Sequence, residues 1–201
     1  MNALNHLYPT LMPELGDVAV FDDFVPEVVQ RNVLRLVRRP IWAYGWKSIK
    51  QTDRYGFWHA HFAGGDEQNQ DDCSLELGAN ANAAPIHALW QHLSSSCLRG
   101  HIPVRVYANA HTYGVEGYVH VDSTDEVNHF TTIYYAHGAW DNNWAGETLF
   151  YSSDASDITR AVYPKPGRIA VFRGATPHVA RAVSRECPEL RISVVFKTRL
   201  A

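Results

Sequence analysis

Two different hydrophobic periods divide this chain near its middle. In the first half, residues 25–37 ("VPEVVQRNVLRLV") and 84–98 ("APIHALWQHLSSSCL") place apolar side chains three or four positions apart. That spacing is typical of an amphipathic helix with one buried face. Pro26 suits the first turn of the earlier helix, and Pro40 ends its pattern. We therefore expect two helices, preceded by a short strand in "DVAVFDDF".

From residue 102 onward the pattern changes to short β-type runs. They are "IPVRVYANA", "GYVHV", "HFTTIYYA", "ETLFY", "RAVYP", "RIAVF", "HVARAV" and "RISVVFKT", separated by turn-rich pieces such as "DNNWAG" and "PKPG". Strands that follow one another without intervening helices indicate an antiparallel sandwich or barrel with the helices packed outside. Residues 44–82 have no clear period and predict loops, with one strand near Phe57.

Length and composition are consistent with a single domain. The chain has 201 residues, 46% of them hydrophobic, which is enough to bury a full core. No internal repeat or low-complexity linker interrupts it. We expect one domain over residues 1–201, with N-terminal helical support over about 17–100 and a β core over about 101–199.

Charge and cysteine usage exclude several classes of partner. Lys and Arg number 18 against 21 Asp and Glu, so no excess positive charge is available for a nucleic-acid backbone. No apolar run approaches the ~20 residues of a membrane span, and the N-terminus lacks a basic region followed by an apolar core. The three cysteines include no CxxC pair, which argues against a disulfide framework or a cysteine zinc site. We expect a cytoplasmic protein that binds neither nucleic acid nor membranes.

A candidate metal site lies in the β-rich half. His120 and Asp122 are two positions apart in "YVHVD", so in an extended segment both side chains leave the same face. His178 begins a later predicted strand and supplies a third ligand. Two histidines and one carboxylate form the facial triad that leaves open positions on Fe(II) for oxygen chemistry. The alternative is that these histidines are structural, or bind zinc without redox chemistry.

A candidate cation lies at the start of the last predicted strand. Arg191 opens "RISVVFKT", where its guanidinium can pair with a carboxylate in a pocket or can lie in solvent on an edge strand. Alternation places Ser193 on the same face, where its hydroxyl can donate a hydrogen bond.

Taken together, these motifs resemble the Fe(II)- and 2-oxoglutarate-dependent dioxygenases, specifically their prolyl-hydroxylase-like branch. The resemblance covers roughly residues 17–198. It includes "DVAVFDDFVPEVV", "VRVYANAHTYGVEGYVHVD", "FTTIYYAHGAWDNNWAGETLFY" and "PKPGRIAVFRGATPHVARAV", besides the strand that Arg191 opens. It implies a mainly β fold with flanking helices, the double-stranded β-helix of the cupin-like jelly rolls.

The resemblance also implies cofactors and residue roles. His120, Asp122 and His178 become the catalytic iron ligands, with 2-oxoglutarate and O2 as co-substrates. Tyr107 and Tyr135 fall where this branch places tyrosine hydroxyls near 2-oxoglutarate. Relatives that halogenate replace the carboxylate ligand with a small residue, so a carboxylate here favours hydroxylation or desaturation.

The same resemblance assigns Arg191 to the distal carboxylate of 2-oxoglutarate. One departure affects this assignment, because "SRECPEL" lengthens the turn between the second histidine and the basic residue. Lys197 and Arg181 are the substitutes for this role.

The substrate is less defined than the metal site. Little length beyond the catalytic core favours a small molecule, such as an amino acid or biosynthetic intermediate; a protein prolyl hydroxylase is the alternative within the family. A non-catalytic, metal-binding β-sandwich is the alternative of another class. Candidate substrate contacts are Trp58 in "WHAHF", Trp144 in the loop "GAWDNNWAG", and Arg173 in "FRGATPH". His59 and His61 share one face of the same segment, but no carboxylate or cysteine partner stands at a suggestive spacing, so we expect this segment to line the substrate mouth and not to bind a second metal.

Overall fold

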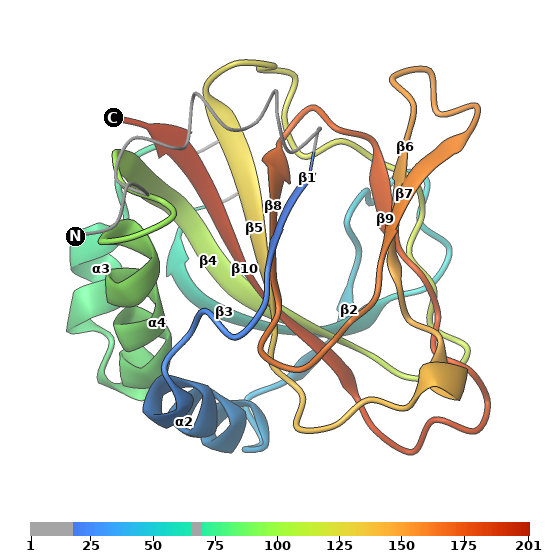
Figure 1. Ribbon diagram of the computed structural model, residues 1–201, viewed down its shortest axis with the longest axis horizontal. Coiled ribbons are helices and arrows are strands. Elements are labelled where there is room, and N and C mark those ends of the chain that lie inside the picture. The colour runs from blue at the N-terminus through green and yellow to red at the C-terminus, as the bar shows by residue number, and fades with distance from the viewer. Residues whose placement is uncertain (1–17, 66–69) are drawn as a thin grey trace.

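Two antiparallel β-sheets dominate the computed structural model, which describes residues 18–65 and 70–201 (Figure 1). The larger sheet has the strand order β1-β8-β5-β10-β4-β3-β2. Its strands are β1 (Val18–Phe21), β2 (Ala43–Trp46), β3 (Phe57–Gly64), β4 (His101–His111), β5 (His129–Tyr135), β8 (Ile169–Arg173) and β10 (Arg191–Leu200). The smaller sheet has the order β7-β6-β9, with β6 (Thr148–Tyr151), β7 (Ile158–Val162) and β9 (His178–Ala180). The mainly β, jelly-roll fold expected from the sequence is confirmed.

The helices lie on one face of the larger sheet, and the smaller sheet lies on the other side (Figure 1). They are α2 (Glu27–Val37), α3 (Ser74–Ala79) and α4 (Ala84–Ser94), with 3-10 turns η2 (Ala81–Ala83) and η3 (Asn142–Trp144). Trp90 of α4 stacks on Phe196 of β10, with ring centroids 5.6 Å apart. In the described part of the chain, no helix is long and apolar enough to span a membrane.

The sequence predicted most of these elements, with three differences. The initial strand and the two long helices are confirmed, and β2 and the short helix α3 were not foreseen within residues 44–82. "GYVHV" is not a regular strand, so that prediction was wrong: its backbone bonds β9 at Gly117, whose amide donates to the carbonyl of Ala180, and at the bridge between His120 and His178. The segment therefore runs beside the free edge of β9 without a continuous ladder, and Val119 and Val121 are exposed there.

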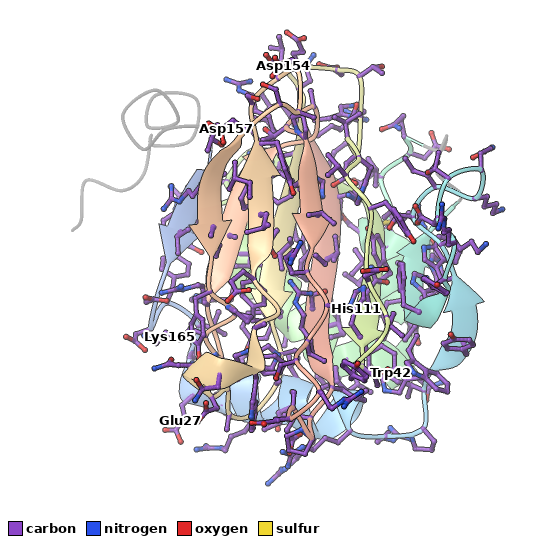
Figure 2. The ribbon with its side chains drawn as sticks, turned by 90° about the vertical axis from the view of Figure 1, so that its right-hand side faces the viewer. Glu27, Trp42, His111, Asp154, Asp157 and Lys165 are labelled. Carbon is purple, nitrogen blue, oxygen red and sulfur yellow. The ribbon has the colours of Figure 1, made fainter. Side chains whose placement is uncertain are left out.

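The central strands of the larger sheet have two chemically different faces. Toward the helices, β4 and β10 present apolar side chains: Val106, Ala108, Ala110, Ile192, Val194 and Phe196. Toward the smaller sheet they present mostly polar ones: Arg105, Tyr107, Asn109, His111, Arg191, Ser193, Val195 and Lys197. Figure 2 shows His111 inside the molecule, whereas Asp154 and Asp157 lie at its edge, at the β6–β7 turn. The inner face therefore carries the chemistry.

Candidate active site

Three metal-capable side chains meet between the two sheets. The ligand atoms of His120, Asp122 and His178 lie within 4.8 Å of one another. Nε2 of His120 is 3.4 Å from Oδ1 of Asp122, and Nε2 of His178 is 3.4 Å from Oδ2. The structure thus brings together the three residues that the sequence proposed as iron ligands.

Backbone pairing fixes this arrangement although two of the ligands lie outside any strand. His178 begins β9, and the amides and carbonyls of His120 and His178 bond each other at 3.1 and 2.9 Å. The amide of Asp122 donates to the carbonyl of Gly174 at 2.8 Å. The bridge, the turn contact and a bond from the Gly117 amide to the Ala180 carbonyl therefore hold His120 beside His178, 58 positions away.

Both histidines present the same nitrogen to the site. Nδ1 of His120 lies 2.8 Å from the carbonyl of Tyr118, and Nδ1 of His178 lies 2.9 Å from the carbonyl of Thr176. A carbonyl only accepts, so each Nδ1 carries the proton and each Nε2 lone pair is free for a metal. Burial lowers the pKa of His178 to about 4, which keeps it in the neutral form that a metal requires.

Asp122 is oriented by two groups on the inner face of the larger sheet. The hydroxyl of Thr131 donates to Oδ2 at 2.7 Å, and the ammonium of Lys197 contacts the same oxygen. Burial alone raises the pKa of this carboxyl, but Lys197 and the two histidines hold it well below its usual range. The carboxylate is therefore charged, with Oδ1 directed toward His120.

These residues fit a ferrous ion. Two imidazole nitrogens and one charged oxygen form the donor set that suits non-haem iron, and a triad of this kind leaves positions on the metal open. The three side chains are 7–15% exposed, so the site excludes most solvent. No cysteine lines the adjoining cavities among the described residues, which argues against a structural zinc site.

A small cavity of about 60 Å³ joins the triad to Arg191. Arg191 is 1% exposed; its Nε donates to the carbonyl of Gly146, and Nη2 donates to Thr148 Oγ1 at 2.8 Å. The hydroxyl of Tyr135 bonds the same threonine at 2.7 Å, and the guanidinium lies 5.5 Å from the Tyr135 ring centroid. Ser193 and Tyr107 also line this cavity. A buried cation therefore lies across the cavity from the triad.

A larger cavity of about 160 Å³ opens on the other side of the triad. Its lining includes His120 and Asp122, together with Trp46, Arg105, Tyr107, Asn109 and Lys197 from strands β2, β4 and β10. His59 of β3 supports this wall: it stacks on Trp46 at 4.2 Å and bonds Asn109 at 2.9 Å.

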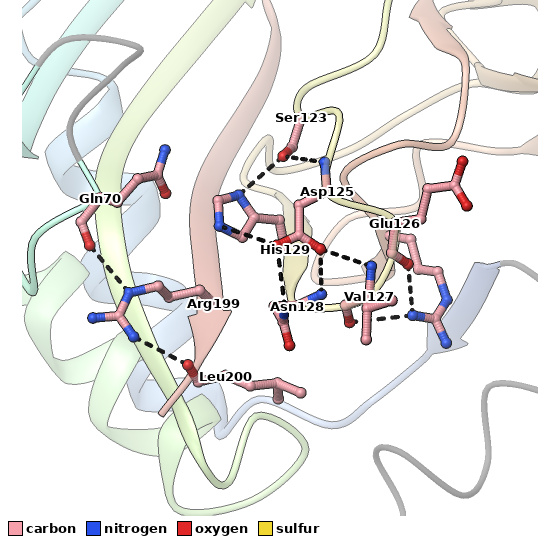
Figure 3. Close-up of polar contacts among 10 residues, drawn as sticks. Gln70, Ser123, Asp125, Glu126, Val127, Asn128, His129, Arg199 and Leu200 are labelled. Atoms are coloured by element: carbon pink, nitrogen blue, oxygen red, sulfur yellow. Dashed lines mark hydrogen bonds and ion pairs between the residues drawn. The ribbon is translucent and has the colours of Figure 1, made fainter.

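The three proposed substrate contacts lie elsewhere. Trp58 packs on the helix side, edge-to-face with Tyr44, because alternation along β3 directs Phe57 and His59 inward instead. Trp144 packs edge-to-face against Trp140. Arg173 donates to the carbonyls of Glu126 and Val127, beside the loop of residues 123–129 drawn in Figure 3. None of the three lines either cavity in the part of the chain that the structure describes.

The two substitutes for Arg191 and the second histidine pair differ in their exposure to solvent. Arg181 is exposed, whereas Lys197 lines both cavities and pairs with Asp122. His61 is exposed whereas His59 is buried, and these two histidines form no cluster with a third metal-capable side chain among the described residues.

Sequence reasoning overlooked four residues of the site. Trp46, Arg105 and Thr131 were not singled out, and Lys197 was considered only as a substitute for Arg191. A signal existed for two of them: alternation in "VRVYAN" places Arg105 beside Tyr107, and alternation in "RISVVFK" places Lys197 on the face of Arg191. Nothing in the sequence indicated that the segment bearing Trp46 lies beside β3.

Comparisons with known proteins were consistent with this geometry. Residues 107–197 match the family model described as the 2OG-Fe(II) oxygenase superfamily. No curated protein matches the chain. Among solved structures, an oxidoreductase of the 2OG-Fe(II) oxygenase family from Burkholderia pseudomallei is 15% identical, with a TM-score of 0.68 over 96% of this chain and 89% of that one.

Two further structures are similar at the same identity of 15%. A Trichoplax adhaerens prolyl hydroxylase, in complex with a hypoxia inducible factor oxygen degradation domain peptide fragment, aligns with a TM-score of 0.61 over 96% of this chain and 89% of that one. A Pseudomonas putida prolyl-4-hydroxylase aligns with a TM-score of 0.60 over 95% and 97%. These likenesses confirm the double-stranded β-helix fold.

Proposed function

We propose a function from the premise that residues 107–197 of this chain carry the pattern of the 2OG-Fe(II) oxygenase superfamily, which confirms the resemblance found in the sequence. The protein is accordingly a 2-oxoglutarate-dependent, non-haem iron dioxygenase, with Fe(II) as cofactor and 2-oxoglutarate and O2 as co-substrates. Its proposed reaction is hydroxylation of an unactivated C–H bond in a small molecule, with release of succinate and CO2. The observation that supports it most is the shared cavity of the triad and Arg191.

In this proposal the chain holds the metal and its co-substrate at opposite ends of the small cavity. His120, Asp122 and His178 bind Fe(II), and the Arg191 guanidinium binds the distal carboxylate of 2-oxoglutarate. When bound, iron with 2-oxoglutarate and O2 supplies the oxidant for C–H hydroxylation. The charge on Arg191 has no carboxylate partner among the described residues, which supports its role as an anion receptor.

Four residues complete the proposed co-substrate pocket. Tyr135 and Thr148 position the guanidinium of Arg191 through the hydroxyl pair described above. Ser193 is 4% exposed and lies across the β5–β10 ladder from Tyr135, so its hydroxyl faces the same cavity. Tyr107 lines both cavities, at the boundary between co-substrate and substrate.

The substrate side favours a small molecule. The larger cavity reaches the triad through a volume of only about 160 Å³, walled by Trp46, Arg105 and Tyr107. A protein prolyl hydroxylase is the second candidate, because several of the structural neighbours are prolyl hydroxylases, one of them with a bound peptide.

Succinate release distinguishes the two candidates. The purified protein is supplied with Fe(II), ascorbate, 2-oxoglutarate and O2, and succinate is quantified with free amino acids or with proline-containing peptides. The proposal predicts stimulation by a free amino acid and none by the peptides. Stimulation by peptides alone would assign protein hydroxylation, and the absence of iron-dependent succinate under every condition would contradict the activity itself.

A further inference from the structure

The larger cavity contains a buried cation that the proposed co-substrate site does not use. Arg105 is 8% exposed, and its Nε has no hydrogen-bond partner. Among the described residues the structure records no ion pair or hydrogen bond to any of its guanidinium nitrogens. Its recorded contacts are aromatic: the guanidinium carbon lies 5.0 Å from the Trp46 ring centroid and 4.8 Å from that of Tyr107.

Strand pairing raises the free-energy cost of burying the Arg105 charge. Arg105 of β4 is the direct partner of Lys197 of β10, and like charges directly opposite each other destabilise a sheet. Lys197 pairs with Asp122, whereas Arg105 faces Gly64 on its other side, which offers no side chain. Cation–π contacts offset only part of the cost of burying a guanidinium, which cannot lose its charge. An anion bound from outside would complete the site.

The charge balance of the two cavities supports the same conclusion. Asp122 is the one acidic side chain that lines either cavity in the described chain, against the cations Arg105, Lys197 and Arg191. Fe(II) and 2-oxoglutarate carry opposite double charges, so their joint binding leaves the positive excess unchanged. Arg191 lies at the small cavity, and Arg105 lines only the larger one. Arg105, a cation without a recorded acidic partner among the described residues, is therefore on the substrate side.

We propose that the guanidinium of Arg105, between the rings of Trp46 and Tyr107, binds a carboxylate group of the small-molecule substrate. This inference rests on the proposed function, because it places the substrate's reacting carbon at the triad end of the same cavity. The planar fork of arginine matches a carboxylate with two parallel hydrogen bonds. The aromatic walls favour a substrate with apolar surface next to its carboxylate.

Benzoate and benzamide test this proposal, because they share a ring and differ in the charged group. Their binding is measured by calorimetry on the anaerobic full-length protein loaded with Fe(II) and 2-oxoglutarate, while the visible spectrum reports whether 2-oxoglutarate stays on the metal. Benzoate should bind about tenfold or more tightly than benzamide, since a hydrogen bond to a charged group contributes more than a neutral one. The 2-oxoglutarate band should persist.

Variants then assign the preference to one residue. Arg105→Gln should remove the benzoate preference, Arg105→Lys should keep part of it, and Arg99→Gln, which removes an exposed arginine charge, should keep all of it. If Arg105→Gln does not fold, the wild-type pair and Arg105→Lys still decide. Equal binding of both probes, no binding of either, or loss of the 2-oxoglutarate band on adding benzoate would overturn the carboxylate site.

Two further outcomes distinguish the carboxylate site from a phosphate site and from a failure of the proposed function. Displacement of benzoate by lower concentrations of inorganic phosphate would reassign the site to phosphate and overturn the carboxylate proposal. If the protein forms no Fe(II)–2-oxoglutarate band, the proposed function is contradicted. If the band is intact and benzoate is not preferred over benzamide, this inference alone is contradicted.

Discussion

The two faces of strands β4 and β10 differ in chemistry. Toward the helices they carry apolar side chains, with Val106, Ala108, Val194 and Phe196 fully buried. Toward the smaller sheet the same strands carry Arg105, Arg191 and Lys197. Burying a large apolar side chain stabilises a fold by roughly 1.5–3 kcal/mol, whereas an unpaired buried charge costs several kcal/mol. The helix-covered face thus offsets the cost of a polar interior that binds ligands.

The largest effect should follow removal of a metal ligand from the inner face. His178→Ala should lower iron-dependent succinate release about a hundredfold or more, because loss of groups that merely support a ligand already costs 10–100-fold. The fold should persist, as judged by the thermal midpoint and circular dichroism. His61→Ala, which removes an exposed histidine of β3, is the matched control. Full activity of the His178 variant would remove this residue from the site.

A change on the opposite face should affect stability and spare ligand binding. Phe196 is fully buried against Trp90, so Phe196→Ala should reduce the free energy of unfolding by about 3–5 kcal/mol in urea titrations. The 2-oxoglutarate concentration for half-maximal turnover should stay within about twofold under conditions where the variant is folded. A large rise in that concentration would show that the two faces are not independent.

The next effect concerns the co-substrate. Arg191→Gln should raise the 2-oxoglutarate concentration for half-maximal turnover about ten- to a hundredfold, because it removes charge-assisted hydrogen bonds to a carboxylate. Iron affinity should not change, since Arg191 has no contact with the triad. Arg191→Lys, which keeps the charge, should require a 2-oxoglutarate concentration between those of the wild type and Arg191→Gln. An unaltered requirement would move the carboxylate-binding role to Lys197.

The smallest predicted effect compares two adjacent threonines of β5. Thr131 faces inward and donates to Asp122, whereas Thr132 faces the helices and its hydroxyl has no hydrogen-bond partner within the described chain. Thr131→Val should weaken iron binding about tenfold, measured by equilibrium titration, because the carboxylate loses a positioning bond. Thr132→Val should leave iron affinity unchanged and should not destabilise the protein. Equal effects of both substitutions would mean that Thr131 acts only through packing.

The sequence predicted the fold well because its strands and helices have clear periods. Alternation identified β4, β5 and β10, and helical spacing identified α2 and α4. Residues 44–82 have no period, so β2 and α3 were missed, and with β2 the position of Trp46. "GYVHV" has strand-like composition, but backbone pairing depends on a distant partner and occurs only at Gly117 and His120.

The sequence predicted only part of the candidate site, because some of its contacts depend on how separate strands pack together. The triad and Arg191 stand at recognisable positions in a family pattern, and the structure brings them to one pair of cavities. Alternation along β4 indicates which face of the sheet Arg105 lies on. Whether its guanidinium finds an acidic partner depends on how β3, β4 and β10 pack together, which the sequence does not reveal. Trp58 and Trp144 were proposed as substrate contacts because each lies in an aromatic-rich segment. Their rings pack against Tyr44 and Trp140 instead.

The visible spectrum of the anaerobic protein tests the central claim most directly. Fe(II) is added first and 2-oxoglutarate second, to the wild type and to Asp122→Ala, with iron content and folding measured in both. The account predicts a new charge-transfer band that requires both additions and is weakened in the variant. Iron binding by a folded wild-type protein without any such band would contradict 2-oxoglutarate chelation at His120, Asp122 and His178.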